Sequence, residues 1–89
     1  MSQITIYTKD YCPYCVKAKT LLKQKGVEAK IHEIDITRDE KLQAEMMEKS
    51  GGQRTVPQIF IGDTHVGGAD ALYTLNNEGK LDPLLKSLD

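Results

Sequence analysis

Two cysteines separated by two residues are the feature of this 89-residue sequence best suited to chemistry. The segment reads Cys12-Pro13-Tyr14-Cys15, and the chain has no other cysteine. Thiols this close together do not form the dispersed disulfide framework that holds small secreted domains together. In a reducing compartment, such a pair is either redox-active or half of a metal site. The secondary structure expected around the pair distinguishes a redox-active pair from half of a metal site.

The cysteine pair lies where a strand is expected to give way to a helix. Residues 3–8 alternate, with Ile4 and Ile6 on one face, and this alternation predicts a strand. Apolar positions then recur at helical spacing over 13–25, and Gly26 follows where a helix should stop. The expected apolar stripe consists of Val16, Ala18, Leu21 and Leu22.

A cysteine at the start of a helix is favoured as a thiolate. Pro13 suits the first helical turn, so the sulfur of Cys12 should face the free backbone amides and the positive end of the helix dipole. Cys15 follows about one turn later, within reach of a mixed disulfide on Cys12, and we expect it to be the more buried of the two. A stable Cys12 thiolate also leaves quickly when another thiol attacks, which predicts a site tuned for turnover.

A second strand and a second helix are expected to follow. Residues 29–36 carry isoleucines in a strand-like run. Thr37 and Glu40 have the spacing of a capping box, which predicts a helix that starts there and ends in the glycine-rich segment 50–52. The expected apolar stripe of this helix consists of Leu42, Met46 and Met47.

The last third of the chain predicts a hairpin and two helices. Strands are expected over 58–62 and 65–67, joined by a short loop. Asp70 is predicted to cap a helix that runs toward Asn77, and Asp82 to cap the final helix. With no repeat or linker in the sequence, we expect residues 1–89 to form a single domain.

Composition excludes several classes of function. Lysine and arginine number 12 against 13 for aspartate and glutamate, a net charge of −1, which argues against a nucleic-acid partner. The apolar runs are only a few residues long, far short of the roughly 20 needed to cross a bilayer, so we expect no membrane span. The first residues do not read as a secretory signal, so we expect a cytoplasmic location.

Three motifs, in this order and spacing, resemble those of a dithiol glutaredoxin of the thioredoxin superfamily. They are Cys12-Pro13-Tyr14-Cys15, Thr55-Val56-Pro57 and Gly67-Gly68-Ala69-Asp70, and the resemblance covers essentially the whole chain. It implies an α/β, thioredoxin-like fold in which helices flank a four-stranded mixed sheet, in the order βαβαββαα.

The resemblance also implies a glutathione site beside Cys12. The peptide bond before Pro57 would be cis, and the backbone of Val56 would pair with the cysteinyl part of glutathione like an added strand. Family members often carry Cys-Asp-Asp after the glycine pair, where this chain has Ala69-Asp70-Ala71, so a second acidic contribution is lost there. The implied glutathione contacts are Lys9, Gln53 and Tyr14 around the glycine end, Thr55, Val56 and Pro57 at the centre, and Gly68, Ala69 and Asp70 at the γ-glutamyl end.

The implied activity is glutathione-dependent thiol–disulfide exchange. Cys12 would be the nucleophile and Cys15 the resolving thiol, with glutathione as the reducing co-substrate and no metal. Substrates would be small mixed disulfides and disulfide-containing or glutathionylated proteins, among them enzymes that resemble ribonucleotide reductase. We expect a monomer.

Three other functions would also use a cysteine pair. Some relatives bridge a [2Fe–2S] cluster between two subunits, although Pro13 argues mildly against it. A zinc site is disfavoured because His32 and His65 are not accompanied by a second cysteine pair. Reduction without glutathione, as in thioredoxins, is disfavoured because the chain lacks Cys-Gly-Pro-Cys and carries the glutathione motifs.

Three tyrosines lie near the cysteine pair in the sequence. Tyr7, Tyr11 and Tyr14 resemble a stacking platform, but packing in the strand and the groove explains them more simply. We therefore expect all three rings to be packed against the protein.

Overall fold

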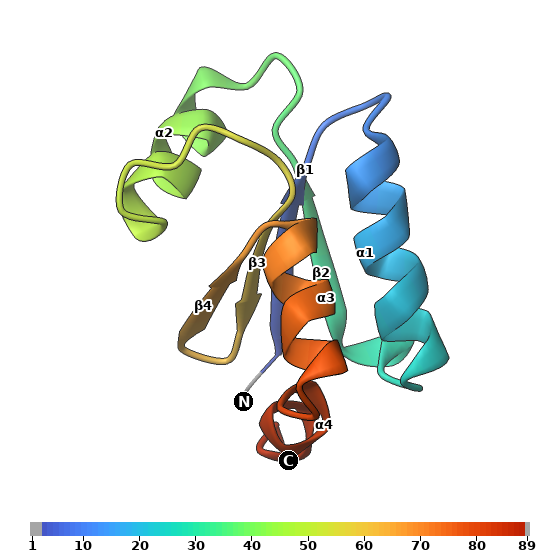
Figure 1. Cartoon of the computed structure of the whole chain (residues 1–89). Helices are drawn as coiled ribbons and strands as arrows, with labels where there is room; N and C mark the ends of the chain where they lie inside the picture. The colour runs from blue at the N-terminus through green and yellow to red at the C-terminus, as the bar shows by residue number, and fades with distance from the viewer. Residues whose placement is uncertain (1–2, 89) are drawn as a thin grey trace.

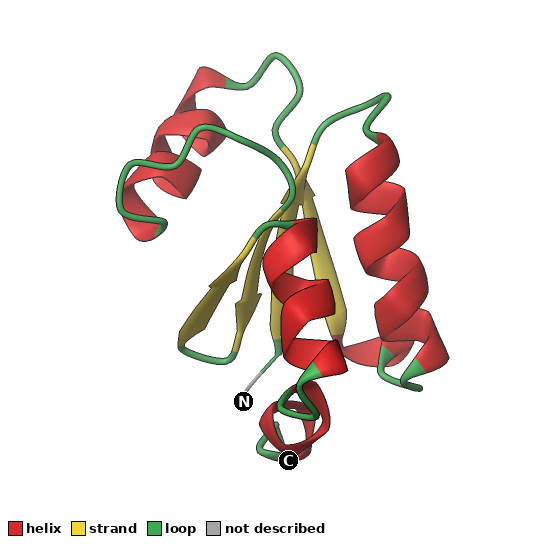
Figure 2. Ribbon diagram, in the orientation of Figure 1, coloured by secondary structure: helices red, strands yellow, loops and turns green. Residues whose placement is uncertain are grey.

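The computed structural model describes residues 3–88, and its elements follow the predicted order βαβαββαα (Figures 1 and 2). No helix within this range is long and apolar enough to span a membrane. The elements are β1 (Ile4–Thr8), α1 (Pro13–Gln24), a 3₁₀ turn (Glu28–Lys30), β2 (Ile31–Asp35), α2 (Glu40–Lys49), β3 (Gln58–Ile61), β4 (Thr64–Gly67), α3 (Ala69–Asn77) and α4 (Leu81–Lys86).

The four strands form one mixed sheet in the order β2-β1-β3-β4. β1 pairs with β2 in parallel and with β3 antiparallel, and β3 pairs antiparallel with β4. At the end of β1 nearest the cysteines, Tyr7 lies opposite Ile34 on one side and Gln58 on the other. The predicted mixed, four-stranded sheet is confirmed, and β1 leads from its centre directly to Cys12.

Helices cover both faces of the sheet (Figure 2). Ile4 and Ile6 point toward the larger core, which they share with buried residues of α1, α3 and α4. Tyr7 points to the opposite face and packs in a smaller cluster with Ile36, which follows β2, and with Met46 of α2. Burying each large apolar side chain is worth about 1.5–3 kcal/mol. The larger core therefore fixes α1 and α3, which begin directly after Cys12 and after the glycine pair, against the same face.

The predicted capping box at the start of α2 is wrong. The Thr37 hydroxyl accepts a hydrogen bond from the backbone amide of Asp10, at 2.7 Å, instead of capping the helix. Arg38 adopts a left-handed conformation, with φ of 58°, so the chain makes one more turn before the helix begins. The cap is Asp39, whose carboxylate accepts from the amide of Leu42 at 3.0 Å.

Two other predicted caps and one predicted core position are also wrong. Gly68, and not Asp70, is the cap residue of α3, and Asp70 lies in the first turn of that helix. Lys80, and not Asp82, is the cap residue of α4. The helix already includes the fully buried Leu81, so Asp82 lies in its first turn. Val16 is 58% exposed and is not part of the buried stripe of α1.

Candidate active site

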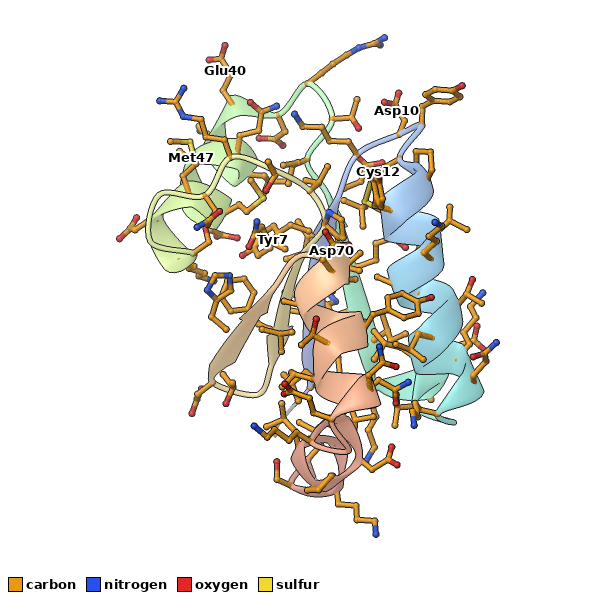
Figure 3. All side chains as sticks on the ribbon, viewed as in Figure 1. Tyr7, Asp10, Cys12, Glu40, Met47 and Asp70 are labelled. Carbon is orange, nitrogen blue, oxygen red and sulfur yellow. A yellow bond between two sulfur atoms is a disulfide. The ribbon has the colours of Figure 1, made fainter. Side chains whose placement is uncertain are left out.

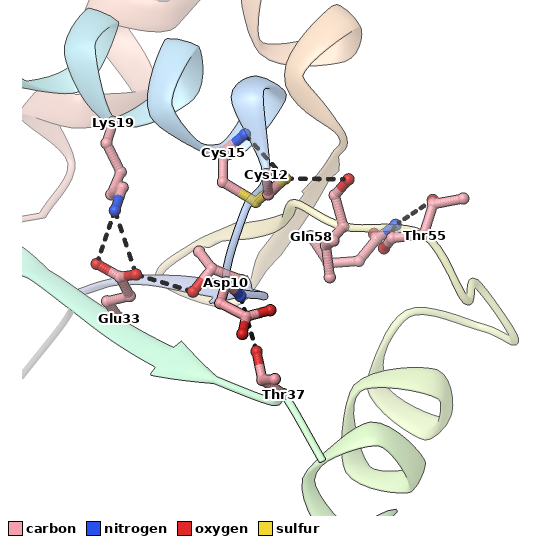
Figure 4. The surroundings of a disulfide bond; sticks show 10 residues. Asp10, Cys12, Cys15, Lys19, Glu33, Thr37, Thr55 and Gln58 are labelled. Atoms are coloured by element: carbon pink, nitrogen blue, oxygen red, sulfur yellow. Dashed lines mark hydrogen bonds and ion pairs between the residues drawn. A yellow bond between two sulfur atoms is a disulfide. The ribbon is translucent and has the colours of Figure 1, made fainter. Parts of the chain in front are cut away.

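Cys12 and Cys15 form a disulfide at the amino end of α1 (Figure 4). Cys12 is the residue that caps the helix, and its Sγ accepts a hydrogen bond from the backbone amide of Cys15 at 3.2 Å. Cys15 is 2% exposed, whereas Cys12 remains half-buried. The predicted position of Cys12 at the helix start and the deeper burial of Cys15 are both confirmed.

Tyr7 is packed as expected. Its ring is fully buried and lies edge-on to Phe60, with ring centroids 5.9 Å apart. The Tyr7 hydroxyl donates a hydrogen bond to the carboxylate of Glu45 at 2.8 Å. Burial, together with this carboxylate, raises the pKa of Tyr7 to about 12. Tyr7 therefore stays neutral and holds α2 against the sheet behind the site.

Tyr11 is not packed, contrary to the expectation for all three tyrosines. Its side chain is 99% exposed, and its backbone has φ of 54°, in the left-handed region. The neighbouring Asp10 amide is bound to Thr37, which ties this loop to the segment after β2. Tyr14 is also more than half exposed, and the ammonium group of Lys17 lies 5.6 Å from the centre of its ring.

One open groove of about 540 Å³ lies beside Cys12, and we call it the backbone groove. The Cys12 Sγ lies 4.0 Å from the carbonyl oxygen of Val56, at the edge of this groove. The Val56–Pro57 peptide bond is cis, as the family resemblance implied. The groove is lined by Tyr14, Thr55, Val56, Pro57, Gly68, Ala69, Asp70 and Ala71.

Gly68 lines the backbone groove at the point where the chain leads into α3, and Gly67 comes directly before it. Gly67 has φ of 112°, a conformation that residues with a side chain rarely adopt. A Cβ atom on Gly68 would lie 3.6 Å from the carbonyl oxygen of Pro57, so the two motif segments approach closely. α3 begins at Ala69, and its first backbone amides have no partner within the helix. Figure 3 shows Asp70 at this end of α3, the end nearest Cys12.

Gln58 is a positioning residue that sequence reasoning missed. Its buried side-chain amide donates to the carbonyl oxygen of Thr55 at 3.0 Å and to the Thr55 hydroxyl at 3.2 Å. Its other amide atom, Oε1, lies 2.8 Å from Nε2 of His65. The Thr-Val-Pro segment is therefore tied to the sheet (Figure 4). A glutamine at the start of the predicted strand 58–62, directly after the motif proline, is the signal that could have identified it.

A second opening, of about 400 Å³, lies on the β2 side of the disulfide, and we call it the charged hollow. Within it, the Lys19 ammonium lies 3.1 Å from the Glu33 carboxylate, which also accepts from the Thr8 hydroxyl at 2.8 Å. The lining residues are Lys9, Asp10, Tyr11, Cys12, Pro13, Cys15, Val16, Lys19, Glu33 and Asp35.

Both carboxylates that β2 contributes to the charged hollow have lowered pKa values. Burial pushes the pKa of Glu33 upward, but hydrogen bonds from Thr8 and Lys19 outweigh it and hold the pKa below its usual value. Hydrogen bonds from Thr37, through its side chain and its backbone amide, lower the pKa of Asp35. Both groups are ionised at neutral pH.

The structure brings most of the predicted glutathione contacts together. Lys9 lies in the charged hollow with both cysteines, outside the lining of the backbone groove. Gln53 belongs to neither lining set, and its exposed segment is held by Ser50, whose Oγ accepts from the Gln53 amide at 3.1 Å. The contacts that line the backbone groove are Tyr14, Thr55, Val56, Pro57, Gly68, Ala69 and Asp70.

Comparison with known proteins gives one consistent result. A family model described as Glutaredoxin matches residues 4–66. Glutaredoxin 3 of Escherichia coli K12 is 50% identical over 86 residues, which cover 97% of this chain and all of that protein.

Solved structures agree with the sequence matches. A buckwheat glutaredoxin–glutathione complex superimposes with a TM-score of 0.85 at 34% identity, covering 98% of this chain and 79% of that one. The glutaredoxin of Brucella melitensis is 56% identical, with a TM-score of 0.81, covering 97% of this chain and 90% of that one. These matches confirm the predicted thioredoxin-like fold.

Proposed function

The chain belongs to the glutaredoxin family of glutathione-related thiol–disulfide oxidoreductases, and from this premise we propose that it reduces glutathione mixed disulfides and protein disulfides through Cys12 and Cys15. Its reducing co-substrate is glutathione. The observation that carries this proposal is the position of Cys12, which caps α1 and lies next to the carbonyl of Val56 at the edge of the backbone groove.

The cycle on a mixed disulfide requires Cys12 alone. The Cys12 thiolate attacks the glutathione sulfur, a Cys12–glutathione disulfide forms, and the substrate leaves as a thiolate that takes a proton from water. The thiolate of a second glutathione molecule then attacks the same glutathione sulfur. This step forms oxidised glutathione and returns Cys12 as a thiolate. The amino end of α1 favours the thiolate in both steps, because its free amides face the sulfur.

Reduction of a protein disulfide uses both cysteines. Cys12 first forms a mixed disulfide with one sulfur of the substrate and releases the other as a thiol. Cys15 then loses its proton and attacks the sulfur of Cys12, which forms the disulfide seen in this structure and releases the reduced protein. Two molecules of glutathione reopen this disulfide and leave as oxidised glutathione.

The backbone groove would hold glutathione mainly through main-chain groups. The amide and carbonyl of Val56 would pair with its cysteinyl unit, and the first amides of α3 would bind the γ-glutamyl carboxylate. Asp70 would contact the ammonium group of glutathione. Lys9 and Gln53 are proposed for the glycine carboxylate, which places that end of the ligand toward the charged hollow.

A coupled assay with glutathione, glutathione reductase and a mixed-disulfide substrate tests the proposal. The wild-type protein should turn over the substrate, and Cys12→Ser should lower the rate to that of glutathione alone. Full activity of Cys12→Ser would contradict the mechanism. The absorption spectrum and the mass of the same preparation test the alternative, because a cluster-bridged dimer would be brown and twice the size of the monomer.

A further inference from the structure

The exposed hydrophobic side chains of this protein gather around the reactive disulfide. Across residues 3–88, the large hydrophobic side chains that remain exposed are Tyr11, Tyr14 and Val16, at 99%, 57% and 58%. All three lie within four residues of Cys12 in the sequence. Exposed hydrophobic side chains that gather in one place, rather than lying scattered, are typical of surfaces where another molecule binds.

These side chains belong to two different surfaces. Tyr14 lines the backbone groove, where the proposed function places glutathione. Tyr11 and Val16 line the charged hollow, on the other side of the disulfide. A binding role for the Tyr11 and Val16 surface therefore needs a second occupant, one that is present together with glutathione.

The exposure of Tyr11 is built into the loop. Its φ of 54° is unfavourable for a residue with a Cβ atom, and the loop holds it there through the hydrogen bond from the Asp10 amide to Thr37. Figure 3 shows Asp10 on the loop that leads to Cys12. The ring of Tyr11 is therefore held in solvent, one residue before the nucleophile Cys12.

The charges of the hollow indicate the chemistry of that partner. Lys19 is paired with Glu33, and the proposed function assigns Lys9 to the glycine carboxylate of glutathione. Asp10 and Asp35 are the other carboxylates that line the hollow, and both residues are exposed. An apolar surface beside exposed carboxylates matches a ligand that carries both an apolar group and a cation.

We propose that the charged hollow docks the polypeptide part of a glutathionylated protein and favours a cysteine flanked by an apolar residue and an arginine or lysine. This inference rests on the proposed function. Glutathione occupies the backbone groove, the apolar side chain packs on Tyr11 and Val16, and the cation faces Asp10 and Asp35. Cys12 forms its bond with the glutathione sulfur, and the polypeptide leaves as a thiol.

Two substrates and two variants of Tyr11 test the docking surface. One substrate is a glutathionylated peptide with leucine and arginine beside its cysteine, and the other is the mixed disulfide of glutathione with 2-mercaptoethanol. Tyr11→Asn removes the ring but keeps a residue that tolerates positive φ. It should lower kcat/KM for the peptide about tenfold, the usual effect of losing an aromatic anchor, and leave the small disulfide unchanged. Tyr11→Phe should retain peptide turnover.

A second pair of measurements tests the charge preference. Replacing the arginine of the peptide by glutamate should lower kcat/KM for the wild-type protein. Asp10→Asn should reduce this preference about threefold, the size expected for an exposed ion pair. Raising the salt concentration should reduce the preference in the wild-type protein as well.

The outcomes separate this inference from the proposed function. Failure of the wild-type protein to turn over either substrate with glutathione would overturn the proposed function and the inference together. Normal turnover of both substrates, with Tyr11→Asn affecting neither or both equally, would overturn the docking surface alone. A dimer that dissociates in Tyr11→Asn, detected by light scattering, would also overturn it, because the ring would then bind a second copy of this chain.

Discussion

The two openings on either side of the disulfide are built in different ways. The backbone groove is lined by a cis-proline segment, Gly68 and the first turn of α3, and five of its eight lining residues can offer polar groups only through the main chain: Val56, Pro57, Gly68, Ala69 and Ala71. The charged hollow is lined by side chains, with Tyr11 and Val16 beside carboxylates and lysines of α1, β2 and the loop before Cys12.

This difference indicates which part of the site can vary between relatives. Main-chain groups present the same hydrogen bonds whatever the neighbouring side chains are, which suits a constant ligand such as glutathione. Side chains can be exchanged without a change in the fold, which suits partners that differ. Cys12 lies at the edge of the backbone groove and also lines the charged hollow, so it is within reach of glutathione on one side and of a variable protein substrate on the other.

The largest predicted effect separates the two cysteines. Cys15 lines the charged hollow and is buried, and it takes no part in the exchange between Cys12 and glutathione. Cys15→Ser should therefore keep the turnover of small glutathione mixed disulfides and reduce the turnover of a protein disulfide to background. The measurement is the coupled assay with each substrate in turn. Equal losses with both substrates would mean that the two reactions share Cys15.

The next prediction concerns the support of the backbone groove. Gln58→Ala removes the hydrogen bonds to Thr55, so the loop that carries Val56 loses its tie to the sheet. Losing a buried hydrogen-bonding group costs about 1–3 kcal/mol, and we expect KM for glutathione to rise about tenfold.

The control for Gln58 is His65→Ala. It removes the contact between His65 and Gln58 but leaves both hydrogen bonds from Gln58 to Thr55 in place. It should change KM for glutathione much less than Gln58→Ala does. An equal rise in both variants would mean that the stability of the sheet, and not the position of Thr55, controls glutathione binding.

A smaller effect is expected at the far end of the same groove. Asp70 lies in the first turn of α3, and its carboxylate is proposed to contact the ammonium group of glutathione. Asp70→Ala leaves the main-chain amides in place, so kcat/KM for glutathione should fall only about three- to fivefold, with little change in the melting temperature. Unchanged dependence on glutathione concentration would remove Asp70 from the binding site.

The smallest predicted effect concerns the framework of the charged hollow. The folded-state pKa of Glu33 lies below its ordinary value, so its contribution to stability is present above about pH 4.3 and is lost as the pH falls through the folded-state pKa. Glu33→Gln should cost about 0.2–1 kcal/mol at neutral pH and low salt, and less in acid.

Urea unfolding at neutral and acidic pH measures this contribution. Glu28→Gln, which removes the more exposed ion pair with Lys23, is the control and should change stability less. A loss in Glu33→Gln that is the same at both pH values would contradict the assignment of the ionised carboxylate, held by Thr8 and Lys19, as its source.

The sequence predicted those parts of the site that depend on special backbone residues. Pro13 restricts the main chain to the conformation of a first helical turn, so the position of Cys12 at the start of α1 could be predicted from the residues themselves. The segments of the backbone groove were implied by the family resemblance, which Pro57 and the glycine pair carry. The exposure of Tyr11 could not, because it depends on a left-handed residue and on a hydrogen bond from Asp10 to a different loop.

Contacts between distant loops also explain why part of the predicted fold was wrong. The order of strands and helices followed from the periodicity of apolar residues, which reflects burial directly. The start of α2 did not, because Thr37 and Asp39 both suit a helix cap, and the choice depends on Asp10, which lies 27 residues before Thr37. Contacts of this kind between distant loops leave no local pattern in the sequence.

The division between the two openings is tested most directly by trapping the first intermediate. Cys15→Ser, mixed with one equivalent of a glutathionylated peptide in the absence of free glutathione, should be analysed by mass spectrometry of the intact protein. We predict that glutathione is attached to Cys12 and that the peptide is released as a thiol. A protein that instead carries the peptide on Cys12, with glutathione released, would contradict it.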